Sequence, residues 1–450
     1  MNHKYIPHTE QDIKKMLDTI GVSSIDDLFR EVPSEIKLKR DYNFTNSLSE
    51  LEVTKRLQDL ASKNKSSDDL TCFIGAGAYD HYIPSVIHHI TNRSEFYTAY
   101  TPYQPEVAQG TLQYIFEYQT MISNLTGMDV SNASMYDGAT STAEAMMMAV
   151  AKRRKNKVLV SKTIHPNTLS VLKTYAKYQG VEIKMIETKD GITSRDDLED
   201  KIDNTIAGVI VQNPNFYGRI EDVESYVDLI HEHKSLLIMN VNPISLPVLK
   251  TPGEIGADIV CGDAQPLGIP LSFGGPYIGF LATTNSLMRK MPGRICGETT
   301  DIEGKRAFVL TLQAREQHIR REKANSNICS NQSLNALAVT VYLSTLGNQG
   351  TREVALQNIK KSHYAFKKIS ALNGFEAVYD GPFFNEFVIK SDYDYNTIKN
   401  TLYEKGIISG LHLGDYDNSL KNHILFCVTE KRTAKEIDHL VDVLGGLAHA

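Results

Sequence analysis

Short runs of apolar, mostly β-branched residues alternate with amphipathic helical stretches between about residues 70 and 330, and this alternation constrains the fold most. The predicted strands are 157–161, 182–187, 208–212, 235–240, 257–261 and 277–283. Helices are predicted between several of them, for example at 167–180 and 221–234. Strands that alternate with helices form mainly parallel sheets covered by helices on both faces. We therefore expect a large α/β domain over residues 66–330.

Two further regions flank this domain. Residues 1–65 are predicted to form a helical arm, in which Thr9 caps a first helix that Gly21 ends. The arm either packs on its own chain or wraps a partner subunit, and the sequence leaves both possibilities open. Residues 331–450 are predicted to form a C-terminal α+β domain. It begins with a long helical region and ends in a helix with a capping box made by Thr433 and Glu436.

Composition excludes several functional classes. The formal net charge is −6, so no global basic surface attracts nucleic acid or an anionic membrane. No stretch approaches the roughly 20 apolar residues of a membrane helix, and the first residues lack the apolar run of a signal peptide. The five cysteines are scattered without metal-ligand spacing and suit a reducing compartment. We expect a soluble, cytoplasmic protein without a bound metal.

One helix start has the composition of an anion site. Gly138 opens the segment GATSTAEAMMMA, which offers hydroxyl groups and backbone amides to a ligand at a helix N-terminus. Ligands of open α/β sheets bind beyond the carboxyl ends of the strands, where such a helix begins. A plain helix cap has the same composition, and this alternative stays open.

A stiff aromatic loop is predicted at 96–106, FYTAYTPYQPE. Pro102 and Pro105 exclude regular structure there, so its three tyrosines line a cleft or pack into an interface. His165 directly follows a predicted strand, where a histidine is either a structural residue or the neighbour of a cofactor ring. The basic segment 315–323 is predicted to be helical and either faces an anion or is solvated.

Several longer segments together resemble one family. They are FIGAGAYDHYIP (73–84), FYTAYTPYQPEVAQGTLQ (96–113), YDGATSTAEA (136–145) and REKANSNICSNQ (321–332). They resemble the P-proteins of the glycine cleavage system, the glycine dehydrogenases (decarboxylating), and within them the α chains, or subunit 1, of two-chain forms. The resemblance runs from end to end. It implies the type I fold of pyridoxal-phosphate (PLP) enzymes.

The same resemblance singles out a missing lysine. Catalytic chains of the family carry a His-Lys pair, a proline five residues after the lysine, and a GGP motif beyond it. Pro270 and Pro276 set this register here, so Gln265 stands at the lysine position and Ala264 at the histidine position. No lysine occurs between residues 251 and 289. An amide cannot replace the amine that bonds PLP covalently.

A second cofactor anchor is replaced as well. The resemblance places Asn242 where the family has the aspartate that pairs with the PLP ring nitrogen. A neutral amide stabilises a pyridinium less well than a carboxylate does. We therefore expect this chain to be inactive alone and a β chain to carry the PLP, in an α2β2 assembly. The pair would decarboxylate glycine and pass the aminomethyl group to the lipoyl arm of the H-protein.

The resemblance also implies roles for residues of this chain in its partner's site. Tyr97, Tyr100, Tyr103 and Gln104 are expected to line the cleft for glycine and the lipoyl group. Ser326 and Asn327 are expected to contact the phosphate of the partner's PLP, and His165 to be a vestigial ring-stacking residue. Two alternatives remain: a self-sufficient PLP aminotransferase or lyase with an unrecognised lysine, and a non-catalytic scaffold or regulatory pseudoenzyme subunit.

Overall fold

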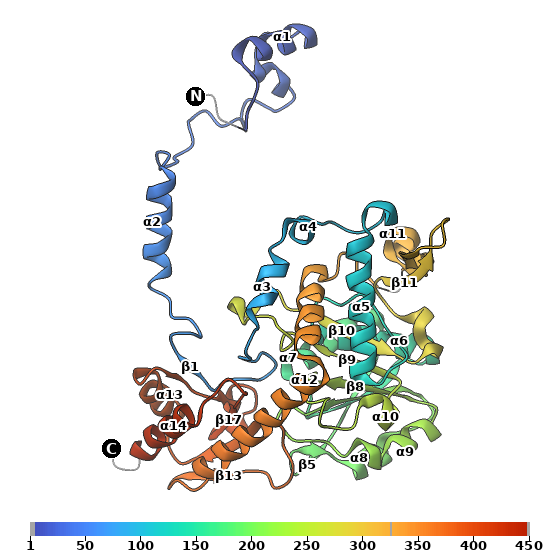
Figure 1. The fold of residues 1–450 in the computed structure, drawn as a ribbon, viewed down its shortest axis with the longest axis vertical. Coiled ribbons are helices and arrows are strands. Elements are labelled where there is room, and N and C mark those ends of the chain that lie inside the picture. Colours follow the sequence, from blue (N-terminus) through green and yellow to red (C-terminus); the bar gives the residue numbers. More distant parts are fainter. Residues whose placement is uncertain (1–4, 325, 448–450) are drawn as a thin grey trace. The chain divides into compact units, whose positions relative to one another are not determined.

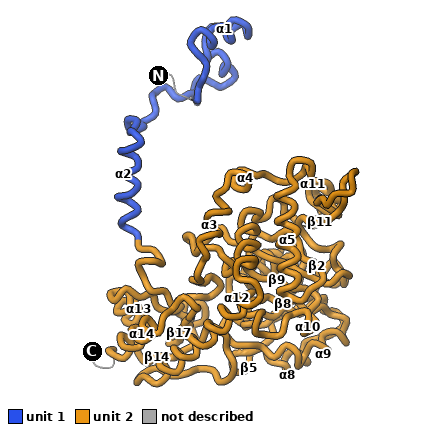
Figure 2. The backbone as a smooth tube through the Cα atoms, in the orientation of Figure 1, with its two compact units in different colours: residues 1–64 blue, residues 65–450 orange. Residues whose placement is uncertain are grey.

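The computed structural model describes residues 5–324 and 326–447. The chain divides into two compact units, residues 1–64 and 65–450 (Figure 2). No helix among the described residues is both long enough and apolar enough to cross a membrane.

The first unit is helical (Figure 1). It contains α1 (Glu10–Ile20), a 3-10 helix (Ile25–Phe29) and α2 (Glu50–Ala61). Thr9 caps α1 in a reciprocal pair with Asp12, and Gly21 ends the helix with φ 83°, which confirms the predicted boundaries. None of these three elements has a buried residue, so this part of the described chain has no core of its own.

A seven-stranded sheet forms the centre of the second unit. Its order is β2-β10-β9-β8-β7-β3-β4. The strands are β2 (Val130–Ser131), β3 (Lys157–Ser161), β4 (Glu182–Ile186), β7 (Ile206–Asn213), β8 (Leu236–Val241), β9 (Ile259–Asp263) and β10 (Gly279–Thr283). The five strands from β9 to β4 are parallel, and β10 is antiparallel to both of its neighbours. The predicted strands and the predicted α/β class are confirmed.

Helices cover both faces of this sheet. They are α5 (Gln109–Thr126), α6 (Gly138–Arg153), α7 (Pro166–Gln179), α8 (Arg195–Lys201), α9 (Val227–Glu232), α10 (Pro252–Ile255) and α12 (Ser333–Ile369). Alternate residues of β7 enter different cores: Val209 and Val211 pack with residues of α5 and α12, whereas Ile210 packs with residues of α6 and α7. Burial on both faces explains why the strands are continuous apolar runs rather than alternating ones.

The helix predicted at 221–234 is shorter than expected. The structure has a 3-10 turn at Val223–Ser225 and then α9, because Tyr226 lies between them with a non-helical φ of −134°. The basic segment near 315–323 is likewise not one helix. It is a series of short turns: Gln313–Arg315, α11 (Gln317–Arg320) and Arg321–Lys323.

A four-stranded antiparallel sheet follows α12, in the order β13-β14-β17-β16. Its elements and neighbours are β13 (Phe375–Ala377), β14 (Glu386–Ser391), α13 (Tyr395–Glu404), β15 (Ile407–Ile408), β16 (Leu411–His412), β17 (His423–Cys427) and α14 (Ala434–Gly446). The predicted capping box of Thr433 and Glu436 opens α14. The helix α12 changes direction at Gly347 (φ 58°, ψ −171°) and contributes Tyr342 to the core of the large sheet and Ile369 to that of the small one.

The remaining elements connect these layers. They are β1 (Thr71–Cys72), α3 (Ser85–Thr91), α4 (Ser94–Tyr97), the hairpin of β5 (Thr188–Lys189) with β6 (Ile192–Thr193), and the hairpin of β11 (Ile295–Thr300) with β12 (Arg306–Thr311). β1 pairs in parallel with β15, so the loop at 73–84, which directly follows β1, begins beside the C-terminal part of the chain.

Candidate functional site

A cavity of about 250 Å³ lies beyond the carboxyl ends of the central parallel strands, where ligands of open α/β sheets bind. The strand-end residues that line it are Gln212, Asn240, Asn242 and Asp263, together with Gly138 at the start of α6 and His165 before α7. Residues 76–79, Asn385 and Glu386 also line it. None of the described residues that line this cavity is lysine or arginine.

Carboxylates of the chain itself occupy the start of α6. Asp137 caps the helix by accepting a hydrogen bond from the backbone N–H of Thr140 at 2.8 Å. Asp263 Oδ2 accepts one from the backbone N–H of Gly138 at 3.0 Å. Burial raises the pKa of Asp263 to about 7. A helix start that already holds two carboxyl groups is a poor place for a phosphate, although helix N-termini attract anions in general.

Gln265 is buried directly after β9 and has no free hydrogen-bonding group. Its Oε1 accepts from the backbone N–H of Tyr79 at 2.8 Å, and its Nε2 donates to the carbonyl of Tyr79 at 2.9 Å and to that of Ile269 at 2.7 Å. The side chain is thus a structural link between two loops rather than a group that faces a ligand.

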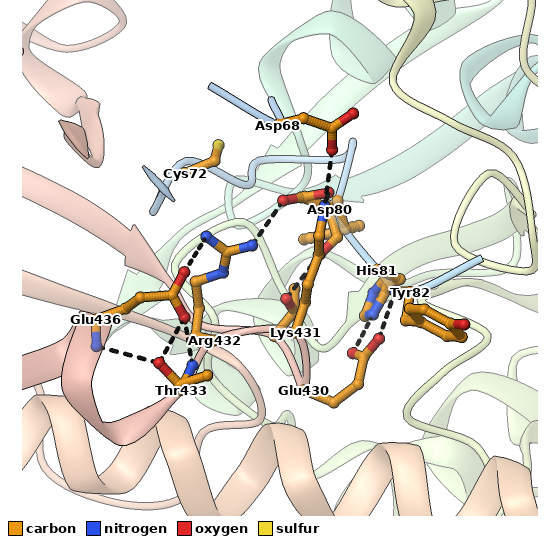
Figure 3. A network of polar contacts seen from close by, with 12 residues as sticks. Asp68, Cys72, Asp80, His81, Tyr82, Glu430, Lys431, Arg432, Thr433 and Glu436 are labelled. Carbon is orange, nitrogen blue, oxygen red and sulfur yellow. Dashed lines mark hydrogen bonds and ion pairs between the residues drawn. The ribbon is translucent and has the colours of Figure 1, made fainter. Parts of the chain in front are cut away.

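The loop at 73–84 is fixed by further contacts with the C-terminal part of the chain (Figure 3). Asp80 forms ion pairs with Lys431 at 2.8 Å and Arg432 at 2.9 Å, and His81 Nδ1 lies 2.6 Å from Glu430. The run Glu430-Lys431-Arg432 follows β17, but nothing in its local pattern points to a partner about 350 residues away. Sequence reasoning therefore missed this network.

A second pair of buried groups joins the same loop to β14. The hydroxyl of Tyr79 donates to Glu386 Oε2 at 2.9 Å, and the backbone N–H of Ala76 donates to Glu386 Oε1 at 2.6 Å. Burial raises the pKa of Glu386 to about 7. The loop wall of the cavity is thereby held by Gln265, Glu386 and the ion pairs of Asp80 together.

His165 lines the cavity, but both of its ring nitrogens have partners. Nε2 lies 2.8 Å from the carbonyl of Ala76, and Nδ1 accepts from the backbone N–H of Asn167 at 3.1 Å. This pairing requires the neutral ring with its hydrogen on Nε2, and burial lowers the pKa of His165 accordingly. The ring edge packs on Phe216 with centroids 5.0 Å apart.

The tyrosine loop does not line this cavity. Tyr97 is the last residue of α4, and both it and Tyr100 are largely exposed, with relative accessibilities of 65% and 83%. Tyr103 is also exposed, and its hydroxyl accepts a hydrogen bond from Arg294 at 3.2 Å. Gln104 is exposed beside it. Their side chains are available to another chain or to a ligand.

Ser326 and Asn327 also lie outside the cavity. The hydroxyl of Ser326 donates to Glu144 on α6 at 2.8 Å, and Asn327 is exposed. Burial raises the pKa of Glu144 to about 7. Within this chain the structure therefore brings His165 and Asn242 to one cavity, and leaves the tyrosine loop, the half-buried Ser326 and the exposed Asn327 outside it.

The comparisons with known proteins decide the family. The model of the glycine cleavage system P-protein matches residues 3–444. The chain belongs to this P-protein family. A relative from Bacillus cytotoxicus, named "Probable glycine dehydrogenase (decarboxylating) subunit 1", is 55% identical over 447 residues, which cover 99% of this chain and 100% of the relative.

Solved structures agree with this assignment. The crystal structure of glycine decarboxylase (P-protein) of the glycine cleavage system, in inhibitor-bound form, is 40% identical with a TM-score of 0.91, and the match covers 99% of this chain and 100% of that chain. Sphingosine-1-phosphate lyase from Burkholderia pseudomallei shares the fold at 14% identity, with a TM-score of 0.67 and coverage of 93% and 94%. The architecture is the type I fold of PLP-dependent enzymes, as the resemblance implied.

The cavity of this P-protein chain does not fit PLP. A covalent site needs an amine, yet Gln265 offers an amide with every group already bonded. The Oδ1 of Asn242 accepts from the backbone N–H of Ile244, so no carboxylate stands there for a ring nitrogen. At the start of α6, Asp137 and Asp263 already accept the hydrogen bonds of the backbone N–H groups of Thr140 and Gly138, which a phosphate would need. No group of histidine, cysteine and acidic side chains suited to a metal ion occurs in the described part of the chain.

Proposed function

We propose that this chain is subunit 1 of a two-chain glycine dehydrogenase (decarboxylating) and that it completes an active site whose PLP is held by a β chain. The observation that carries the proposal is the bonding of Gln265, a buried amide locked to Tyr79 and Ile269 behind the wall of a cavity that no lysine lines among the described residues. Family membership supports glycine decarboxylation as the reaction. The misfit of this cavity to PLP supports the proposal that the β chain holds the cofactor and that this chain completes the site.

The cofactor would supply an electron sink for the charge that remains on glycine after loss of carbon dioxide. This chain would contribute surface groups at the interface. Tyr97, Tyr100, Tyr103 and Gln104 would position glycine and the incoming lipoyl arm of the H-protein, because their hydroxyl and amide groups are exposed on a proline-stiffened loop. The expected product is the aminomethyl group on that arm.

Ser326 and Asn327 would contact the phosphate of the partner's PLP, and the Ser326 hydroxyl would turn from Glu144 to the phosphate to do so. Both lie outside this chain's own cavity, Asn327 exposed and Ser326 half-buried beside it. We propose an α2β2 assembly, because type I enzymes build their sites between chains, and a cytoplasmic location, because all five cysteines are free.

Reconstitution tests this function. Glycine–bicarbonate exchange is measured with this chain, with the β chain and with an equimolar mixture of both. Exchange is expected only from the mixture, in the presence of lipoylated H-protein. Exchange by this chain alone would establish the self-sufficient PLP enzyme instead.

A non-catalytic scaffold has one observation in its favour, because the polar groups of Gln265 and Asp263 at this chain's own cavity are bonded to its backbone rather than free for a ligand. The exposed tyrosine loop favours a catalytic contribution. Substitution of the loop in the assembled enzyme separates these two roles.

A further inference from the structure

The cavity at the ends of the parallel strands is lined by acidic groups that no cation compensates. Asp137, Asp263 and Glu386 line it together with the neutral His165, and none of the described lining residues is lysine or arginine. Burial raises the pKa of Asp263 and of Glu386 to about 7, and no cation lies close enough to either to influence its ionisation. Uncompensated carboxyl groups in a sheltered place favour a cationic ligand over an anionic one.

A buried amide oxygen in the same cavity lacks a partner. Asn385 lines the cavity and is only 1% exposed. Its Nδ2 makes a long contact of 3.7 Å with Cys427 Sγ, whereas its Oδ1 has no hydrogen-bond partner among the described residues. Buried amide oxygens in native proteins normally accept a hydrogen bond. This oxygen therefore requires a donor that the described chain does not supply, which is an observation independent of the carboxyl groups.

Two half-buried side chains add free acceptors to the wall. Asp137 Oδ1 accepts from the N–H and the hydroxyl of Thr140, both at 2.8 Å, and its Oδ2 has no partner among the described residues. Asn240 Nδ2 donates to the Thr142 hydroxyl at 2.8 Å, which leaves the Asn240 Oδ1 free. A primary ammonium group has three N–H donors and no acceptor, so it matches these three oxygens in number and in kind.

The size and the remaining wall of the cavity favour an organic ion. A cavity of about 150 Å³ can hold benzene, and this one has about 250 Å³, so a bare metal ion would leave most of it empty. Ala139, Val241 and Pro266 give part of the wall an apolar surface for a short hydrocarbon chain. The free amide donors of Gln212 and Asn242 are uncharged, so a carboxylate or a phosphate finds no cation here.

We propose that this cavity binds a small aliphatic ammonium ion, with the oxygens of Asp137, Asn240 and Asn385 as acceptors. The place where related folds hold an anionic cofactor is, in this chain, a site for a cation. Ammonium binding requires this chain alone, so it does not rest on the proposed function.

Calorimetric titration of the purified full chain at neutral pH tests ammonium binding. The probes are propylammonium chloride, the neutral 1-propanol of similar size, potassium chloride and sodium acetate. An alkylamine is protonated at neutral pH, as the lysine side chain is. Saturable binding of propylammonium is expected, with no saturable binding of 1-propanol, potassium or acetate.

Two variants locate the site. Asp137→Asn removes one charge and keeps a residue type that caps helices well. Ala139→Leu fills the cavity from a half-buried position on α6. Each is expected to weaken propylammonium binding about tenfold or more. Asp196→Asn, an exposed change in the first turn of α8, is the control and is expected to bind as the wild type does.

The absence of saturable propylammonium binding by the wild-type chain would overturn the site. Equal binding of 1-propanol would show that charge plays no part, and preferential binding of potassium would assign the cavity to a metal ion instead. Binding of acetate in place of propylammonium would reverse the proposed charge of the ligand. Unchanged propylammonium binding in Ala139→Leu would place the ligand elsewhere, and this variant decides even where Asp137→Asn fails to fold.

Discussion

Gln265 holds the backbone of Tyr79 on both sides, with its Oε1 2.8 Å from the N–H and its Nε2 2.9 Å from the carbonyl. The two residues are 186 positions apart, and the amide matches both backbone groups of a buried residue. A lysine could donate to the carbonyl but could not accept from the N–H. The residue at this place therefore serves the loop wall of the cavity rather than a cofactor.

Gln265→Ala is expected to lower the free energy of unfolding by about 3 kcal/mol, because it leaves the N–H and carbonyl of Tyr79 without partners in a buried place. Urea unfolding measures the change. The matched control is Gln113→Ala on α5, an exposed glutamine bonded to Glu117, with an expected loss within about 0.5 kcal/mol. Equal losses in the two variants would show that the bonds to Tyr79 do not stabilise the fold.

Glu386 links stability to pH. Burial raises its pKa from an ordinary value of 4.5 to about 7, so between these values the folded chain keeps a proton that the unfolded chain has lost. The free energy of unfolding therefore falls as pH rises through this window. In Glu386→Gln the fall is expected to be smaller by on the order of 3 kcal/mol, since glutamine keeps contact with Tyr79 and Ala76 without titrating.

Denaturation at about pH 5 and about pH 8 measures this difference. Glu404→Gln, an exposed change at the end of α13, serves as the control and is expected to keep the wild-type dependence. The raised pKa of Asp263 also makes the free energy of unfolding fall as pH rises. Part of the pH dependence is therefore expected to remain in Glu386→Gln. Identical pH profiles for Glu386→Gln and the wild type would contradict the assignment.

Tyr100→Phe removes one exposed hydroxyl from the tyrosine loop. If this hydroxyl positions substrate in the partner's site, turnover of the assembled enzyme is expected to fall about tenfold, without loss of complex formation. Glycine–bicarbonate exchange measures turnover, and gel filtration measures assembly. Tyr178→Phe on α7, another exposed tyrosine, is the control. Full turnover in Tyr100→Phe would favour the scaffold role.

The double substitution Ser326→Ala and Asn327→Ala is expected to weaken PLP binding by the assembled enzyme about tenfold, because two hydrogen bonds to a phosphate are lost. Equilibrium dialysis against PLP measures the affinity. Ser170→Ala, at an exposed position of α7, is the control. An unchanged affinity would make the phosphate assignment wrong.

The sequence predicts the large sheet well, because strands such as β7 are buried on both faces and must be apolar throughout. The helix predicted at 221–234 is interrupted at Tyr226, where the backbone dihedral angles leave the helical region although the local composition favours a helix. Caps such as Thr9 and Thr433 are local and were predicted from a few neighbouring residues. A structural element can be predicted from the sequence where the contacts that determine it are made by neighbouring residues.

The candidate site was less predictable for the opposite reason. Motifs pointed to the tyrosine loop and to Gln265, but no local pattern marks Arg294 as the residue between Tyr103 and Asn331. Its partners are 191 and 37 positions away in the chain. The bonding of Gln265 to Tyr79 could not be predicted for the same reason, so the prediction that Gln265 stands at the family's lysine position came without the structural role that its side chain has here.

Borohydride reduction of the assembled enzyme with bound PLP tests the central claim most directly. Mass spectrometry of the separated chains locates the lysine that becomes covalently labelled. The label is expected on the partner β chain alone, with this chain unlabelled whether glycine is present or not. A labelled lysine in this chain would contradict the account.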